Sequence, residues 1–212
     1  METVAAFFRD GGFFIYLILI VSVIGLAVIV ERVFYLFFWY NVNGRAVWAK
    51  ISVLLQEGRI KEAKELCQGS RVPLINILDQ GIAVANEHDK DIQNAVDEAA
   101  MEIMPAVERR LPYIATLANI ATLLGLLGTI QGLIQAFSAV GMAEPSQKAA
   151  LLASGISISL YTTAFGISVA VPMLGLHTIL QARAHKIIDE IDEFSVKLLN
   201  LLHRMKRGAK TE

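Results

Sequence analysis

Three long runs without a charged residue divide the chain: 13–30, 111–143 and 149–182. A helix of about 20 apolar residues is long enough to cross the roughly 30 Å of hydrocarbon in a bilayer. The interior of a small soluble bundle would not need three such runs. The pattern therefore predicts an all-α membrane protein with three transmembrane helices, which lies in a lipid bilayer.

The segments between and after these runs are polar and amphipathic. Apolar residues recur at helical spacing in 43–111, and Gly58 and the loop signal at 69–73 interrupt them. The pattern predicts helices over 74–85 and 91–111, with the second leading straight into the second span and bending at Pro105 and Pro112. Residues around 141–146 predict a short turn between spans two and three.

The distribution of lysine and arginine predicts the orientation. Nine of these residues lie in 41–110 and seven in 181–212, but the N-terminus and the loop near 141–148 have one each. The positive-inside rule places both large polar segments in the cytoplasm as long helical extensions. The predicted layout is a periplasmic N-terminus (1–12), transmembrane helices (13–40, 112–140 and 149–182), a cytoplasmic helical region (41–111), a periplasmic loop (141–148), and a cytoplasmic C-terminal helix with a basic tail (183–212).

Composition argues against several classes of protein. The net charge of −1 offers no basic footprint for nucleic acid. The single cysteine, Cys67, excludes an internal disulfide and a cysteine-rich metal site. The sequence has no nucleophile triad, phosphate-binding loop or metal-ligand cluster. We therefore predict no enzymatic activity, no cofactor and no metal.

Small and hydroxyl side chains share one face of the third span. At 100° per residue this face holds Gly155, Ser159, Thr162, Thr163, Gly166 and Ala170, and Ser154, Ser157, Tyr161 and Ser168 fall roughly opposite. In the second span, Thr122 and Thr129 share a face with Gly125, Gly132 and Ala136. Tight helix packing accounts for the glycines. It accounts less well for the hydroxyls and Gln131, because packing alone needs few polar groups.

Neither span two nor span three contains Asp, Glu, Lys or Arg. Ionisable groups are the usual proton carriers inside membranes, and hydroxyls cannot take and release a proton near neutral pH. If protons cross these spans, the titrating carboxylate must come from another chain. Glu31 and Arg32, near the end of the first span, are interpreted as a structural anchor rather than a conduction site.

Two stretches of the sequence resemble a known family. Residues 123–137, LLGLLGTIQGLIQAF, closely resemble the second-span signature of the ExbB/TolQ/MotA proton-channel family, and 155–172, GISISLYTTAFGISVAVP, resemble its third-span signature. The Glu31-Arg32 pair and 57–63, EGRIKEA, are similar to its cytoplasmic pattern. The three-span layout is similar to ExbB and TolQ rather than to the four-span flagellar stator.

The resemblance implies a homopentamer in the bacterial inner membrane, with the N-terminus periplasmic and the C-terminus cytoplasmic. Spans two and three would line a pore that holds the single spans of two ExbD/TolR/MotB-like subunits, whose membrane aspartate is protonated. Such a motor subunit couples the ion motive force to movement of the partner and energises outer-membrane or periplasmic work, such as protein transport. A non-conducting membrane scaffold for an envelope complex is the alternative.

The resemblance also implies functional residues. Thr129 and Thr163 match the family's pore-facing threonines, and the predicted ion path adds Thr162 and Ser159. Packing around the pore is predicted for Gly125, Gly128, Gly132, Gly155, Gly166 and Pro172. Ile158 stands where many members have glutamate, and Thr122 where proline is common; the lost glutamate is the best support for the scaffold. Protons are the predicted ion, but a sodium site at Thr129, Thr162 and Thr163 stays open because hydroxyl and carbonyl oxygens suit a hard cation.

Overall fold

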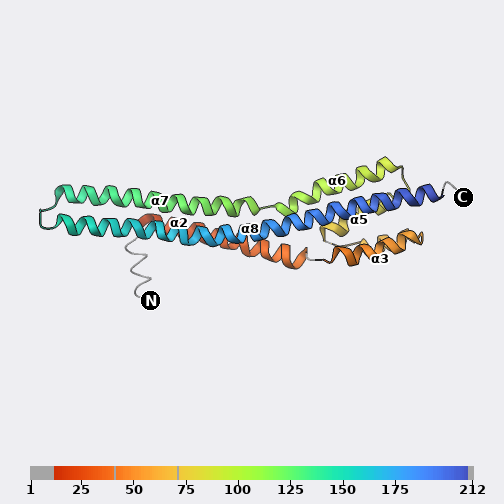
Figure 1. The fold of residues 1–212 in the computed structure, drawn as a ribbon, viewed down its shortest axis with the longest axis horizontal. Coiled ribbons are helices and arrows are strands. Elements are labelled where there is room, and N and C mark those ends of the chain that lie inside the picture. Colours follow the sequence, from red (N-terminus) through yellow and green to blue (C-terminus); the bar gives the residue numbers. More distant parts are fainter. Residues whose placement is uncertain (1–11, 41, 71, 210–212) are drawn as a thin grey trace. The chain divides into compact units, whose positions relative to one another are not determined.

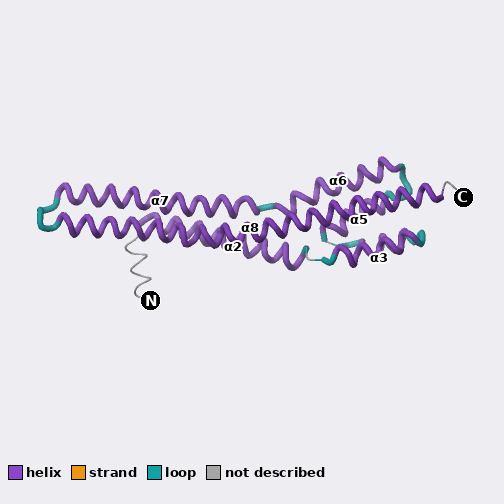
Figure 2. Tube along the Cα trace, viewed as in Figure 1, coloured by secondary structure: helices purple, strands orange, loops and turns teal. Residues whose placement is uncertain are grey.

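The computed structural model describes residues 12–40, 42–70 and 72–209, and the regular structure in these ranges is helical throughout (Figure 2). The predicted all-α class is confirmed. The chain forms two compact units. The described part of the first unit comprises 12–31 and 110–179, and that of the second comprises 32–40, 42–70, 72–109 and 180–209. Each unit is described separately below.

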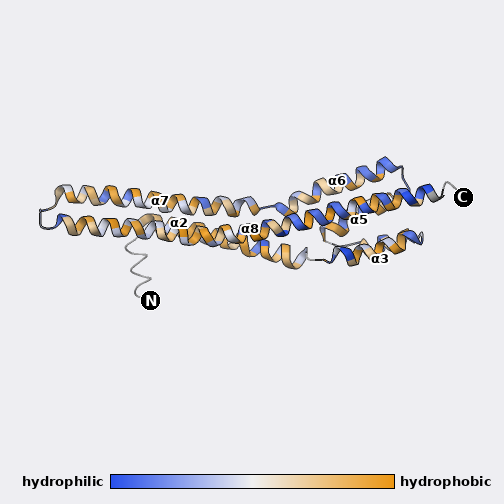
Figure 3. Ribbon diagram, in the orientation of Figure 1, coloured by the Kyte–Doolittle hydropathy of each residue, from blue (hydrophilic) through white to orange (hydrophobic). Residues whose placement is uncertain are grey.

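The first unit, called the apolar unit here, contains α2 (Gly12–Phe34), α7 (Leu111–Met142) and the first half of α8 (Lys148–Ala209). A turn over 143–147 joins α7 to α8, which run antiparallel within this unit (Figure 1). A turn is thus present where 141–146 predicted one, but it begins two residues later, because α7 continues to Met142. Each of these three helices is long and apolar enough to cross a membrane. Their apolar colouring in Figure 3 shows this composition.

The second unit, called the polar unit here, contains the shorter helices and the end of α8. It begins with Arg32 to Phe34, the last residues of α2, and a π-helical turn over Tyr35–Trp39. The helices that follow are α3 (Gly44–Gln56), α4 (Ile60–Cys67), α5 (Pro73–Ala83) and α6 (Asp89–Glu108). Asn43 caps α3, because its side chain accepts a hydrogen bond of 3.3 Å from the backbone N–H of Ala46.

Phe194 and Leu198 of α8 are buried in the core of the polar unit. Gly44, at the start of α3, lies directly against the ring of Phe194. Gly81 of α5 lies against Leu198 and Val96 in the same way. The apolar side of the last part of α8 therefore packs on the shorter helices, as its amphipathic pattern requires.

The junction between α6 and α7 differs from the sequence prediction. We expected one helix to lead straight into the second span, but α6 ends at Glu108 and α7 begins at Leu111. Arg110 between them has a φ of 68°, which is rare for a residue other than glycine. In a continuous helix the ring of Pro112 would clash with the carbonyl of Glu108, four residues earlier. The proline therefore interrupts the helix before its own position.

Cys67 gives a first testable prediction. Burial, together with the nearby Asp79, raises the pKa of its thiol to about 11. At pH 8 the folded chain should therefore react with iodoacetamide on the order of 100-fold more slowly than an ordinary thiol, since the thiolate is the nucleophile. The stability gained from the neutral thiol is complete below pH 9.0 and is lost as the pH rises through about 11. Equal labelling rates in folded and denatured protein would contradict the buried position.

Candidate functional site

The backbones of α7 and α8 approach most closely at Gly125 and Gly166. A Cβ atom added to Gly166 would lie 2.7 Å from the carbonyl oxygen of Ala121 and 3.1 Å from the Cα of Gly125. A Cβ added to Gly125 would lie 3.2 Å from the Cα of Thr163. All three neighbours are backbone atoms, which cannot rotate away as a side chain can. The two glycines therefore permit a helix contact that any larger residue would open.

The contact continues along both helices. An added Cβ would meet the side chain of Thr162 at Gly128, the hydroxyl of Ser159 at Gly132, and Ala136 at Gly155. Phe14 of α2 also lies beside Gly128, and Gly25 of α2 lies against Met173 of α8. These contacts join α2, α7 and α8 within the apolar unit.

The four hydroxyls of the predicted ion path all donate to backbone carbonyls. Thr163 bonds across the helix contact to the carbonyl of Gly125 at 3.0 Å. Thr129, Ser159 and Thr162 donate within their own helices, to the carbonyls of Leu126 (2.6 Å), Gly155 (2.8 Å) and Ile158 (3.3 Å). This satisfies the hydroxyl hydrogens without any contact to another chain.

Burial divides these four hydroxyls into two pairs. Ser159 and Thr162 are 2% and 1% exposed, because α7 covers them in the single chain. Thr129 and Thr163 are half-buried and so remain open to a ligand or a partner on one side. The ion path itself stays a prediction for all four residues.

The predicted packing residues lie in two different places. Gly125, Gly128, Gly132, Gly155 and Gly166 all lie in the α7–α8 contact. Pro172 is exposed on α8, which continues through it without a break. The single chain thus already accounts for the five glycines by contact within the protomer. A role for any of them around a pore stays a prediction.

The opposite face of α8 has the polarity that the sequence predicted. Ser154, Ser157, Tyr161 and Ser168 are all exposed in the single chain. The hydroxyl of Ser168 donates to the carbonyl of Ala164 at 2.7 Å, so its hydrogen already makes a hydrogen bond within α8. The periodicity therefore separated the two faces of the helix correctly.

Glu31 forms an ion pair that sequence reasoning did not find. Its carboxylate accepts a hydrogen bond from the guanidinium of Arg110, which lies 79 residues later in the sequence. The side chains of Arg110 and Glu31 are 39% and 29% exposed. Glu31 therefore has a cationic partner inside the apolar unit, consistent with the structural role expected for it.

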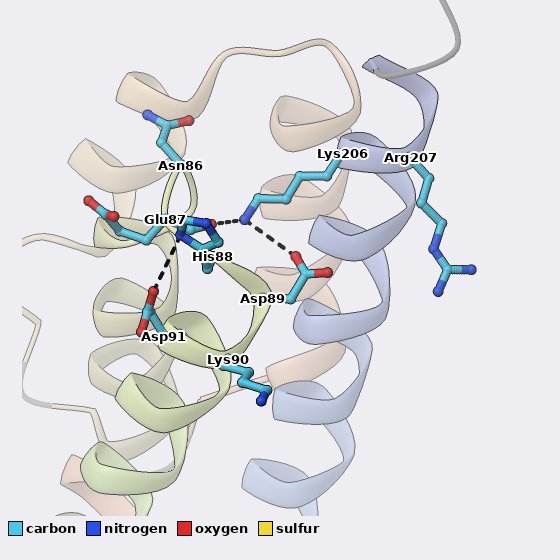
Figure 4. Close-up of a pocket in the computed structure, with 8 residues that line it drawn as sticks. All are labelled: Asn86, Glu87, His88, Asp89, Lys90, Asp91, Lys206 and Arg207. Carbon is cyan, nitrogen blue, oxygen red and sulfur yellow. Dashed lines mark hydrogen bonds and ion pairs between the residues drawn. The ribbon is translucent and has the colours of Figure 1, made fainter.

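A further group of charged side chains lies in the polar unit, where α8 ends beside the start of α6 (Figure 4). Lys206 donates to the carbonyl of Glu87, and its Nζ lies 3.4 Å from Oδ1 of Asp89. Nε2 of His203 lies 3.7 Å from Oδ2 of Asp89. The hollow beside them has a volume of about 820 Å³. Because opposite charges face one another here, the group holds two helices together. It does not form a binding site for an anion or for a cation.

In the described part of the chain, no three His, Cys, Asp or Glu side chains are placed to hold a metal ion.

Comparison with known proteins identifies the family. A family model described as the MotA/TolQ/ExbB proton channel family matches residues 70–193, which include α7 and the whole α7–α8 contact. The chain belongs to this family. The resemblance noted in the two span signatures is confirmed. Members of the MotA/TolQ/ExbB family are described as channel or transport proteins rather than enzymes.

Individual relatives are named ExbB or TolQ. A putative biopolymer transport protein ExbB homolog of Methanothermobacter thermautotrophicus is 27% identical over 90% of this chain and 67% of that protein. Biopolymer transport protein exbB1 of Vibrio cholerae is 27% identical over 95% of this chain and 89% of that protein. The Tol-Pal system protein TolQ of Haemophilus influenzae is 29% identical over 56% of this chain, and the match spans only about half of that protein, 52%.

The glycine contact can be tested with a matched pair of substitutions on α8. Gly166→Ala should destabilise the apolar unit by about 1–3 kcal/mol, as overpacking does, because the new methyl group meets backbone atoms of α7. Gly175→Ala should be neutral or slightly stabilising, since nothing lies within 4 Å of the added methyl. The measurement is thermal unfolding of each detergent-solubilised variant. Similar melting temperatures for the two would show that the contact is not tight.

The Glu31–Arg110 pair can be tested with a double-mutant cycle. Glu31→Gln and Arg110→Gln should each lower the unfolding temperature, and the double variant should lose less than the sum, with a coupling of about 1 kcal/mol for a half-exposed pair. Arg110→Gly is the control for backbone strain, because glycine tolerates the positive φ at this position. Strict additivity in the cycle would mean that the pair contributes nothing.

Proposed function

We propose that this chain is the ion-conducting subunit of a membrane motor. Ion flow past Thr129 and Thr163 is coupled to movement of an ExbD/TolR/MotB-like partner and energises outer-membrane or periplasmic work. The chain acts as a homopentamer around two partner copies, in the bacterial inner membrane, with its N-terminus periplasmic and its C-terminus cytoplasmic. Family membership and the ExbB and TolQ names of its relatives support the proposal.

The need for a partner follows from which side chains α7 and α8 contain. The span segments 111–143 and 149–182 contain hydroxyls but no carboxylate or amine, and their one imidazole, His177, lies near the end of the second segment, away from the α7–α8 contact. A hydroxyl can pass or coordinate an ion, but it cannot hold a proton reversibly near neutral pH. The acid that takes up the proton is therefore supplied by another chain. A partner span with one aspartate fits this requirement.

The outer face of α8 supports assembly into a larger complex. Its exposed side chains include the hydroxyls of Ser154, Ser157 and Ser168, and Tyr161 is 49% exposed. Polar groups that face lipid hydrocarbon are unfavourable, and in membrane proteins they usually face the interior of a bundle or a water-filled cavity. In a bilayer this face is therefore covered by neighbouring subunits or by the partner.

Ion flux through reconstituted vesicles tests the assigned path. The chain and its partner are reconstituted together, and proton flux is followed with a pH-sensitive dye inside the vesicles. The double variant T129V/T163V should reduce the flux about tenfold. The lost hydroxyl ligands are worth about 1–1.5 kcal/mol, and an activation barrier raised by that energy slows ion passage about tenfold. The matched control is T116V/T178V, in which one exposed threonine per helix loses a hydroxyl that bonds only to its own helix.

Three outcomes would contradict parts of the proposal. Equal flux in wild type, T129V/T163V and T116V/T178V would exclude the assigned path. No flux from the wild-type pair under an imposed proton or sodium gradient would favour the non-conducting scaffold, to which Ile158 in place of the family glutamate also points. Flux that follows a sodium gradient and ignores a proton gradient would assign the path to sodium.

A further inference from the structure

A pocket of about 770 Å³ lies in the polar unit, between the start of α3 and the part of α8 that follows its apolar run. Three cations line it: Arg45 from α3, and Arg183 and Lys186 from α8. Three carboxylates line it as well, from Asp189, Glu190 and Glu193. The pocket plays no part in the ion path discussed above.

The pocket lies where lipid headgroups are expected. Arg183 is the first charged residue after the uncharged run 149–182. Its guanidinium carbon lies 5.7 Å from the ring centre of Phe37, in the π-helical turn that follows α2. Phe38 and Trp39 in the same turn are 70% and 43% exposed. Exposed aromatic side chains at the end of a span are typical of the membrane–water interface.

The charges in the pocket are arranged in order along α8. Arg183 and Lys186 come first after the apolar run, and Asp189 and Glu190 follow on the next turn. Lys186 and Glu190 are four residues apart, about one helical turn or 6 Å along the axis. The α8 side of the pocket therefore has a cationic end next to the apolar segment and an anionic end farther from it, and Arg45 of α3 lies near Glu193.

Several charged side chains of the pocket have no direct hydrogen-bond or ion-pair partner in the described part of the chain. In the described ranges, the side chains of Arg45, Lys186, Asp189 and Glu190 make no hydrogen bond and no ion pair. Glu193 is different, because its carboxylate pairs with Lys197 and also feels the charge of Arg45, and both cations lower the pKa of Glu193. Asp189 and Glu190 thus remain available to a cation and Lys186 to an anion, and the side chain of Arg45 is held only by its attraction to Glu193.

We propose that this pocket binds the headgroup of a phospholipid that carries a primary ammonium after its phosphate, as phosphatidylethanolamine does. Arg45, Arg183 and Lys186 hold the phosphate, and Asp189 and Glu190 accept hydrogen bonds from the ammonium. Basic pockets at membrane surfaces are known to hold lipid headgroups. A purely anionic headgroup would leave the two carboxylates facing a negative charge, and a quaternary ammonium would offer them no N–H donor.

Competition between defined lipids tests this proposal. The full-length chain is reconstituted into nanodiscs that contain equal amounts of phosphatidylethanolamine, phosphatidylcholine and phosphatidylglycerol. It is then extracted in mild detergent, and the lipids retained per chain are counted by native mass spectrometry. Wild type should retain phosphatidylethanolamine about tenfold over the other two, the ratio expected from one charge-assisted hydrogen bond.

Two double variants assign the two ends of the pocket. R45Q/K186Q, which changes two exposed side chains and leaves Arg183 against Phe37, should lose retention of all three lipids. D189N/E190Q should still bind lipid through its phosphate but lose the preference for phosphatidylethanolamine. Retention of phosphatidylglycerol should then equal that of phosphatidylethanolamine. K61Q/K64Q, which removes two cations from α4 outside the pocket, is the control and should behave as wild type.

Other results would overturn the proposal. Equal retention of the three lipids by wild type, or equal loss in K61Q/K64Q and R45Q/K186Q, would show that the pocket selects no headgroup. A wild-type preference for phosphatidylglycerol would exclude the role of the carboxylates. Displacement of the lipid by millimolar inorganic phosphate would make the pocket a site for soluble phosphate. None of these readouts depends on ion flux, so they are independent of the proposed motor function.

Discussion

The contact between the backbones of Gly125 and Gly166 determines the arrangement of the whole apolar unit. In lipid, apolar side chains gain little by leaving a hydrocarbon environment, so helices associate through close packing and hydrogen bonds. Here the two glycines bring α7 and α8 near enough for the hydroxyl of Thr163 to reach the carbonyl of Gly125. The same approach buries Ser159 and Thr162 between the helices. A methyl group at Gly166 would therefore disturb hydroxyls well beyond its own position.

Much of this arrangement could be predicted from periodicity. The helix period assigned Ser159 and Thr162 to one face of α8 and Tyr161 to the other, and the structure buries the first two and exposes the third. Periodicity does not tell what a face contacts. The glycines that sequence reasoning placed around a pore pack first against their own neighbouring helix.

Two features could not be predicted in the same way. The break between α6 and α7 was missed because the bends were expected at the prolines, whereas Pro112 acts on the carbonyl of Glu108, one turn earlier. The Glu31–Arg110 pair was missed because its two members lie 79 residues apart and meet only through the tertiary fold. A single sequence contains no signal that links them.

The hydroxyl hydrogens have a consequence for the proposed ion path. Thr129 and Thr163 each donate their hydrogen to a backbone carbonyl, at Leu126 and Gly125. The half-buried sides of these residues can therefore offer only oxygen lone pairs. A surface of this kind attracts hydronium, metal cations or a neutral carboxylic acid, and it repels chloride and an ionised carboxylate. A carboxylic acid on a partner helix would pass this surface more easily when it is protonated. The surface itself would therefore favour movement of the partner helix after proton uptake.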